Sequence, residues 1–158
     1  GRKNIAYICG PLSLGGCKDR LKGYQEALKK AGIPFRKDYV VEVEDFRFEQ
    51  AGQALEKLWN MTVKPDGILC FADILAIGTI HAAHNLGIKI PEQLSVAGFG
   101  DDETSRFISP AITTMAQPSF EMGELAAQII LEEIGLSGES CQIRTEIIKP
   151  EIIIREST

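Results

Sequence analysis

Short apolar runs alternate with longer segments of helical period along most of this chain. The strand-like runs are residues 5–9, 39–43, 67–71, 94–98 and 112–115. Segments with apolar residues at three- and four-residue spacing lie between several of them, at 18–31, 48–60 and 73–87. Parallel strands need crossover connections, which are usually helices. The pattern therefore predicts an α/β fold, a Rossmann-like parallel sheet with helices on both faces.

The end of the chain departs from this alternation. Pro118 suits the first turn of a further helix, which carries an apolar stripe and closes at Gly135. Residues 135–140 are then predicted to form a loop. Two apolar runs, 143–148 and 152–154, predict one or two terminal strands. Pro150 stands between them and favours a sheet edge or a break, because proline cannot donate to a strand ladder.

The segment 74–86 is apolar nearly all round, with Asp73 before it as the predicted N-terminal cap and Gly87 at its end. A helix of this kind is buried on several sides. Two interpretations stay open: burial within the domain, or burial across an interface between subunits.

Composition limits the class of protein. The chain has 158 residues, enough for one domain or two small lobes. Its net charge is −5 and it has no basic stretch, so these residues alone are not expected to bind DNA. No apolar run approaches the roughly 20 residues of a membrane span, and no apolar signal segment opens the chain. A cytoplasmic protein with no membrane partner is therefore expected.

The four cysteines are widely spaced, and no Cys-x-x-Cys pair occurs. We expect reduced, mostly buried thiols rather than a disulfide framework or a metal site. They are Cys9, Cys17, Cys70 and Cys141.

A ligand site is expected where the loops after the parallel strands meet at one edge of the sheet. These loops are 10–20, 44–47, 71–73, 98–102 and 116–117. They present hydrogen-bonding groups and one aromatic plate, which suit a small polar or polyhydroxylated ligand. The side chains are Ser13, Lys18, Arg20, Asp45, Phe46, Arg47, Asp73, Asp101 and Gln117.

Nucleotide cofactors are not expected. Gly10 to Gly15 has the spacing of a phosphate-binding loop, but the lysine and hydroxyl residue that should follow are Gly16 and Cys17. The sequence Gly98-Phe-Gly100 lacks the third glycine of a dinucleotide fingerprint. The glycines are better explained by tight turns.

Catalytic and metal-binding interpretations have weak support. The acidic triplet 101–103 could hold Mg²⁺ or supply acid and base carboxylates, but a solvated loop with one residue turned toward a ligand is the simpler interpretation. His81 and His84 would make half a metal site without a third ligand. Ser13 has neither a histidine partner nor a nucleophile elbow. We therefore expect no enzyme, no metal and no cofactor.

Eight runs, taken in order, carry a family resemblance. They are Gly-Arg-Lys-Asn-Ile-Ala-Tyr-Ile at 1–8, Gly-Pro-Leu at 10–12, Arg-Leu-Lys-Gly-Tyr at 20–24, Pro-Asp-Gly-Ile at 65–68, Phe-Ala-Asp-Ile-Leu-Ala-Ile-Gly at 71–78, Ile-Pro-Glu-Gln-Leu-Ser-Val-Ala-Gly-Phe at 90–99, Ser-Pro-Ala-Ile-Thr-Thr-Met-Ala-Gln-Pro at 109–118 and Ile-Arg-Glu-Ser-Thr at 154–158. Their order and spacing resemble the effector-binding core of the LacI/GalR family of bacterial transcription regulators.

The resemblance implies part of a two-lobed, periplasmic-binding-protein-like domain. Residues 1–98 and about 148–158 would belong to the C-terminal lobe, and about 117–147 to an N-terminal lobe that is mostly absent from this chain. The family's DNA-binding domain would lie upstream. A homodimer is expected, which would contact operator DNA through that domain.

By the same resemblance, Arg20 falls at the arginine that contacts the effector and Phe46 at the aromatic that stacks on it. Gln117 falls at a polar position beside the hinge, and Asp73 at the acid of an Asn-Asp pair. The sequence departs from the family pattern at two positions. Ala72 replaces the asparagine of that pair, and Gly100 replaces the first aspartate of the family's Gly-Phe-Asp-Asp. Asp101 is the expected substitute. With the loop residue Ser13, the predicted effector-binding set is Ser13, Arg20, Phe46, Asp73, Asp101 and Gln117.

The sequence thus favours the effector-sensing domain of a DNA-binding repressor that responds to a sugar or similar metabolite, with a mono- or disaccharide preferred. Two alternatives remain open. A solute-binding protein of a transporter would share the fold but need a secretory signal. A metal-dependent α/β enzyme would use the acidic triplet.

Overall fold

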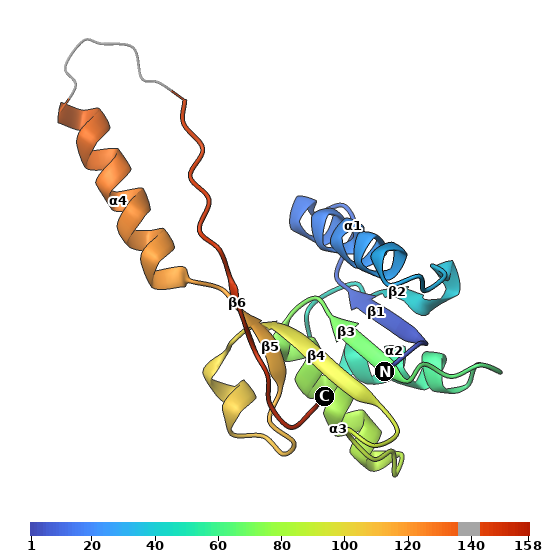
Figure 1. The fold of residues 1–158 in the computed structure, drawn as a ribbon. Coiled ribbons are helices and arrows are strands. Elements are labelled where there is room, and N and C mark those ends of the chain that lie inside the picture. The colour runs from blue at the N-terminus through green and yellow to red at the C-terminus, as the bar shows by residue number, and fades with distance from the viewer. Residues whose placement is uncertain (136–142) are drawn as a thin grey trace.

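The protein, described by a computed structural model at residues 1–135 and 143–158, contains a six-stranded sheet in the order β2-β1-β3-β4-β5-β6 (Figure 1). The pairs β1–β2, β1–β3, β3–β4 and β4–β5 are parallel, and β6 is antiparallel to β5. The predicted parallel sheet is confirmed. The strands are β1 Ile5–Cys9, β2 Val40–Glu42, β3 Gly67–Cys70, β4 Ser95–Gly100, β5 Thr113–Ala116 and β6 Glu151–Ile153.

Helices lie on both faces of this sheet, as predicted. Figure 1 shows α1 on one face and α2 with α3 on the other. Residues of β1 alternate accordingly: Ala6 and Ile8 belong to the core under α2 and α3, whereas Tyr7 and Cys9 belong to a smaller core under α1. The helices are α1 Gly15–Lys30, α2 Phe48–Trp59, α3 Asp73–Asn85 and α4 Ser119–Gly135, with short 3₁₀ turns η1 Lys37–Tyr39 and η2 Glu103–Arg106.

Helix α3 is buried chiefly within the domain. It packs beside α2 and against β3 and β4, and its buried residues come from several sides of the helix. Ile74 and Leu86 remain 36% and 47% exposed. Burial by the protein's own core therefore accounts for most of its apolar surface. An interface with a second subunit would involve only the exposed remainder.

The predicted strand at 143–148 is wrong. This stretch has no strand assignment, and Ile143 and Ile147 are 99% and 84% exposed. An isolated apolar run cannot form a strand without a neighbour to pair with, and the described residues place none beside it. The second run forms β6 at the sheet edge. Pro150 separates it in the sequence from residues 143–148. The predicted loop at 135–140 lies, apart from Gly135, outside the described residues.

Helix α4 projects away from the sheet (Figure 1). Much of its apolar surface faces solvent: Phe120, Ile130, Leu131 and Ile134 are 78%, 58%, 69% and 71% exposed. Of the predicted stripe, Met122, Ala126 and Ile130 are exposed, and Leu125 and Ile129 are half-buried. Within 1–135 and 143–158, no helix is both long enough and apolar enough to cross a membrane.

Three of the cysteines, Cys9, Cys17 and Cys70, are buried and free, as expected. Cys141 lies outside the described residues.

Two stacked tyrosines under α1 differ in one hydrogen bond. The rings of Tyr7 and Tyr24 lie 5.3 Å apart. The Tyr24 hydroxyl donates to the Ile5 carbonyl oxygen at 2.7 Å, whereas the buried Tyr7 hydroxyl has no partner among the described residues. Burial raises the pKa of both phenols, that of Tyr24 to about 12. Both groups are therefore neutral at pH 7.

We predict opposite results for Tyr7→Phe and Tyr24→Phe. Removing the unpartnered Tyr7 hydroxyl should leave the free energy of unfolding unchanged or raise it by up to about 1 kcal/mol, because a desolvated group is lost with no bond broken. The matched change at Tyr24 should lower it by about 1 kcal/mol, since a buried hydrogen bond disappears. Urea denaturation measures both. A larger loss for Tyr7→Phe than for Tyr24→Phe would contradict the assignment.

Candidate functional site

The candidate site lies at the carboxyl ends of the parallel strands. The chain reverses its direction across the sheet beside β1, which has β2 on one side and β3 on the other. Ligands of open α/β sheets bind at such a switch point. The loops after β1, β2, β3 and β4 meet here and bring four aromatic or charged side chains together.

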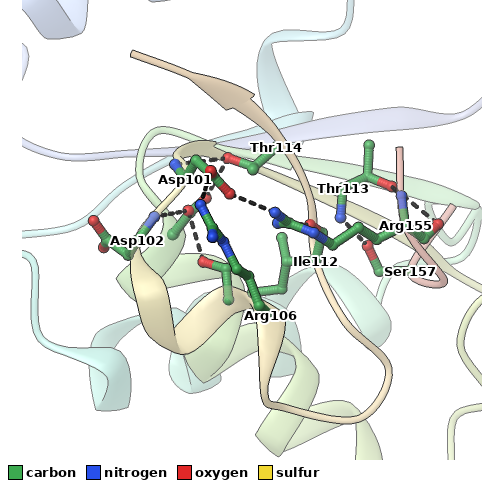
Figure 2. Close-up of polar contacts among 10 residues, drawn as sticks. Asp101, Asp102, Arg106, Ile112, Thr113, Thr114, Arg155 and Ser157 are labelled. Atoms are coloured by element: carbon green, nitrogen blue, oxygen red, sulfur yellow. Dashed lines mark hydrogen bonds and ion pairs between the residues drawn. The ribbon is translucent and has the colours of Figure 1, made fainter. Parts of the chain in front are cut away.

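Asp73 is the centre of a polar network at this edge. It is the first residue of α3, and its carboxylate is fully buried. The carboxylate accepts hydrogen bonds from the Asp102 backbone N–H at 2.9 Å, the Ser105 hydroxyl at 2.7 Å and the Thr114 hydroxyl at 2.7 Å. Asp102 and Ser105 belong to the loop after β4 and Thr114 to β5; Figure 2 labels Asp102 and Thr114. One side chain thus joins three separate segments.

The prediction that Asp73 caps α3 is wrong. The N-cap position is Ala72, and no side chain bonds the first turn. Three donors from other segments occupy the Asp73 carboxylate instead. The Asp73 carboxylate lies so close to β4 that position 98 requires a glycine, because a Cβ atom there would lie 2.0 Å from Asp73 Oδ1. The predicted tight-turn glycine in fact makes room for a buried carboxylate.

Asp101 stands in a left-handed conformation, with φ of 58°. Its two carboxylate oxygens pair with Arg106 and Arg155, each at 2.6 Å (Figure 2). Burial works to raise the pKa of Asp101, but the hydrogen bonds from Arg155 and Arg106 outweigh it, and the pKa is lowered. The carboxylate is therefore ionised at neutral pH, and its charge is already matched by two guanidinium groups.

The C-terminal residues fasten this loop to the sheet. Arg155 donates its backbone N–H to the Thr113 hydroxyl at 2.8 Å and its side chain to the Ile112 carbonyl at 2.9 Å. The Ser157 hydroxyl accepts from the Thr113 N–H and donates to the Val96 carbonyl. Arg155 and Thr114 were not among the predicted site residues. Arg155 lies in the run 154–158 and Thr114 in the run 109–118; both runs carry the family resemblance, but neither identifies the partner of its residue.

Arg20 and Phe46 both contact the ring of Phe71. The Arg20 guanidinium lies over the rings of Phe71 and Phe99, 4.1 Å and 3.5 Å from their centroids. Phe46 stacks on Phe71 at 5.1 Å and covers Gly10, where any Cβ would collide with its ring. Phe71 and Phe99 lie in two of the loops expected to form the site, 71–73 and 98–102, but were not among the side chains selected from them.

Ser13 and Gln117 lie at the rim. Both are exposed. Ser13 occupies the turn before α1, and the Gln117 amide contacts Met122 Sδ at 3.8 Å. Within the described parts of the chain, neither side chain bonds to the other four predicted residues. The structure thus gathers Arg20 with Phe46, and links Asp73 to the loop of Asp101.

A hollow of about 340 Å³ adjoins the arginine. It lies beside α1, over the strand residues of β3, β4 and β5 that face that helix. Its lining is mostly apolar and includes Tyr24, Leu69, Phe99, Met115 and Ile152. This face of the sheet is suited to packing against apolar side chains.

The acidic triplet does not form a metal cluster. Asp101 is paired with arginines, while Asp102 and Glu103 are exposed. Across 1–135 and 143–158, no three His, Cys, Asp or Glu side chains are placed to hold a metal ion. His81 and His84 lie exposed on α3.

A family model, related sequences and solved structures that match this chain agree on one family. The family model described as periplasmic binding protein-like domain matches residues 1–158. The transcriptional repressor CytR of Escherichia coli K12 is 34% identical over 100% of this chain, and the ribose operon repressor of Haemophilus influenzae is 33% identical over 99%. The chain covers 46% of each repressor's length. A LacI-family regulatory protein from Chloroflexus aggregans superimposes with a TM-score of 0.91 at 27% identity, over 99% of this chain and 56% of that one.

We predict that Asp73→Asn destabilises the fold. The amide keeps the shape but replaces one acceptor oxygen with a donor facing Asp102 N–H, Ser105 or Thr114. The expected loss is about 2 to 4 kcal/mol in the free energy of unfolding, measured by denaturant titration.

Asp38→Asn is the matched control, because Asp38 is an exposed carboxylate paired only with Arg36. It should change stability much less. Equal losses for the two variants would show that the buried network contributes no more than a surface ion pair.

Proposed function

The chain belongs to the periplasmic-binding-protein-like domain family of LacI-type repressors, and from this premise we propose that it is the C-terminal part of an effector-sensing domain. The effector is a sugar or similar small metabolite. The observation that carries the proposal is the stack of Phe46, Phe71, Arg20 and Phe99 at the sheet's switch point. An aromatic plate beside an arginine fork suits a small polar ring compound.

The residues proposed to form the site are those predicted from the sequence. Arg20 supplies hydrogen-bond donors and Phe46 an aromatic surface. Ser13 and Gln117 offer exposed polar groups at the rim. Asp73 and Asp101 act through the loop after β4, which their bonds hold in place. The effector-binding set is Ser13, Arg20, Phe46, Asp73, Asp101 and Gln117.

The proposed mechanism is a shift between two lobe arrangements. An effector that contacts both lobes stabilises the arrangement in which it is better bound, and it shifts the equilibrium by its difference in affinity. In the intact protein that shift would change the spacing of paired DNA-binding domains on an operator in the cytoplasm. The domain itself would bind and release without chemistry, so neither an enzyme nor a transporter component is proposed.

We propose the lobe division that the sequence predicted. Residues 1–98 and about 148–158 form one lobe, and about 117–147 belong to the other. In support, α4 projects from the sheet with much of its apolar surface uncovered. Surface of that kind is normally covered, because large exposed apolar patches favour association.

Phe46→Ala should weaken effector binding by the intact protein about 10- to 100-fold, because the ring's contact with the ligand is lost. Calorimetric titration with sugars, sugar phosphates, nucleosides and purines measures it. Phe35→Ala is the control, since Phe35 is 44% exposed and lies outside the site. Unchanged affinity in Phe46→Ala, or no binding of any compound by folded protein, would overturn the proposal.

We also propose a homodimer that uses the exposed face of α2 and α3. A groove there has a lining that is half apolar or small and half polar, and its lining residue Phe48 is 43% exposed. The lining residues are Phe48, Gly52, Gly78, Ala82 and Leu86 together with Glu49, Gln53, Glu56, His81 and Asn85. Light scattering on the intact protein should give twice its chain mass, and Leu86→Glu should halve it. Val63→Glu, at a position 47% exposed and outside the groove, should not. A monomeric wild type would contradict the proposal.

A further inference from the structure

Arg20 is a partly buried cation without an anionic partner in the described residues. Its one hydrogen bond goes to the Phe71 carbonyl oxygen at 2.5 Å. The ionisable groups close enough to influence it are Tyr7 and Cys17, and burial raises the pKa of both, so both are uncharged at pH 7. Burial in turn lowers the pKa of Arg20. Buried charges are normally paired, so this position is unusual.

Most of the other arginines differ from Arg20 in having a carboxylate partner. The chain has seven arginines, and five of them pair with a carboxylate within the described residues. Arg2 instead bonds the Ser95 hydroxyl and the Pro91 and Glu92 carbonyl oxygens. The five pairs are Arg36–Asp38, Arg47–Asp45, Arg106–Asp101, Arg144–Glu132 and Arg155–Asp101.

All but one of the carboxylates considered at this edge of the sheet are engaged within the described residues. Asp45 pairs with Arg47, and Glu42 accepts the Leu12 N–H at 2.7 Å. Asp73 and Asp101 hold the loop after β4. Asp102 has no cation, but it is not among the groups that influence Arg20. Gly100 has no side chain, and its φ of 136° disfavours one.

The two rings determine how Arg20 can bind. The guanidinium lies over Phe71 and Phe99, and these rings accept no conventional hydrogen bond, so the N–H donors other than the one bonded to the Phe71 carbonyl remain unused in the described residues. A guanidinium edge matches two oxygens of a carboxylate or phosphate. The first turn of α1 adds to the positive potential, since it holds Lys18 and no acidic residue.

We propose that the effector carries an anionic oxyacid group, a phosphate or a carboxylate, and that Arg20 binds it through paired N–H···O bonds. The ring or chain of the effector would then lie toward Phe46. The inference rests on the proposed function and names its ligand class. It moves the preference from a neutral mono- or disaccharide to an acidic derivative, because no carboxylate among the described residues neutralises Arg20.

The test is calorimetric titration of the intact regulator with matched ligands. The panel pairs glucose with glucose 6-phosphate and gluconate, and ribose with ribose 5-phosphate, and it includes inorganic phosphate. An acidic member should bind more tightly than its neutral parent by about 10- to 100-fold, the effect of a charge-assisted bidentate pair. Higher ionic strength should reduce the difference.

Variants at Arg20 identify the partner. Arg20→Gln should remove the preference for the acidic member, and Arg20→Lys should keep part of it, since it retains the charge but not the fork. Arg36→Gln is the matched control, because Arg36 also lies over a ring, that of Tyr39, but already pairs with Asp38. Thermal unfolding verifies that each variant is folded.

The outcomes separate this inference from the proposed function. Tighter binding of the phosphate ester supports a phosphorylated effector, and tighter binding of gluconate supports an acid. Equal or tighter binding of a neutral sugar, or an acidic preference that survives in Arg20→Gln, overturns the inference but leaves effector sensing intact. No binding of any member by folded protein overturns both.

Discussion

The buried carboxylate of Asp73 is the constraint on which this edge of the molecule depends. Three donors from the loop after β4 and from β5 satisfy it, and Gly98 leaves the space that it occupies. A buried carboxylate without such donors would be costly. The bonds therefore select one position for the start of α3 relative to the following loop, and that loop in turn presents Asp101 to Arg155.

The candidate site consequently has two unlike halves. Around Asp73 and Asp101, each charge has its partners within the protein, and the side chains set the shape of the loop. Around Arg20, aromatic rings hold a guanidinium whose charge the described residues do not neutralise. The first half is suited to positioning and the second to ligand binding. This division explains how a site can lose polar residues at Ala72 and Gly100 and still offer a strong donor.

Helix α4 and the C-terminal residues 151–158 differ in whether they have a surface to pack against. Residues 151–158 find partners on β5 and in Val96, and they are held by hydrogen bonds. Helix α4 and residues 143–150 have apolar side chains but extend away from the sheet. Apolar surface of this extent requires a partner surface, which accords with the view that these residues complete a second lobe.

Periodicity along the sequence was enough to determine the parallel sheet and its flanking helices, and it indicated the edge at which we propose the site. Those features follow from local patterns and chain-reversal rules. Tertiary structure alone decided which polar groups remain free to bind a ligand. Asp73 meets Thr114 and Asp101 meets Arg155 across 41 and 54 residues, and Arg20 meets Phe71 across 51. No local pattern identifies partners so distant, because side-chain neutralisation depends on contacts that exist only after the strands have assembled.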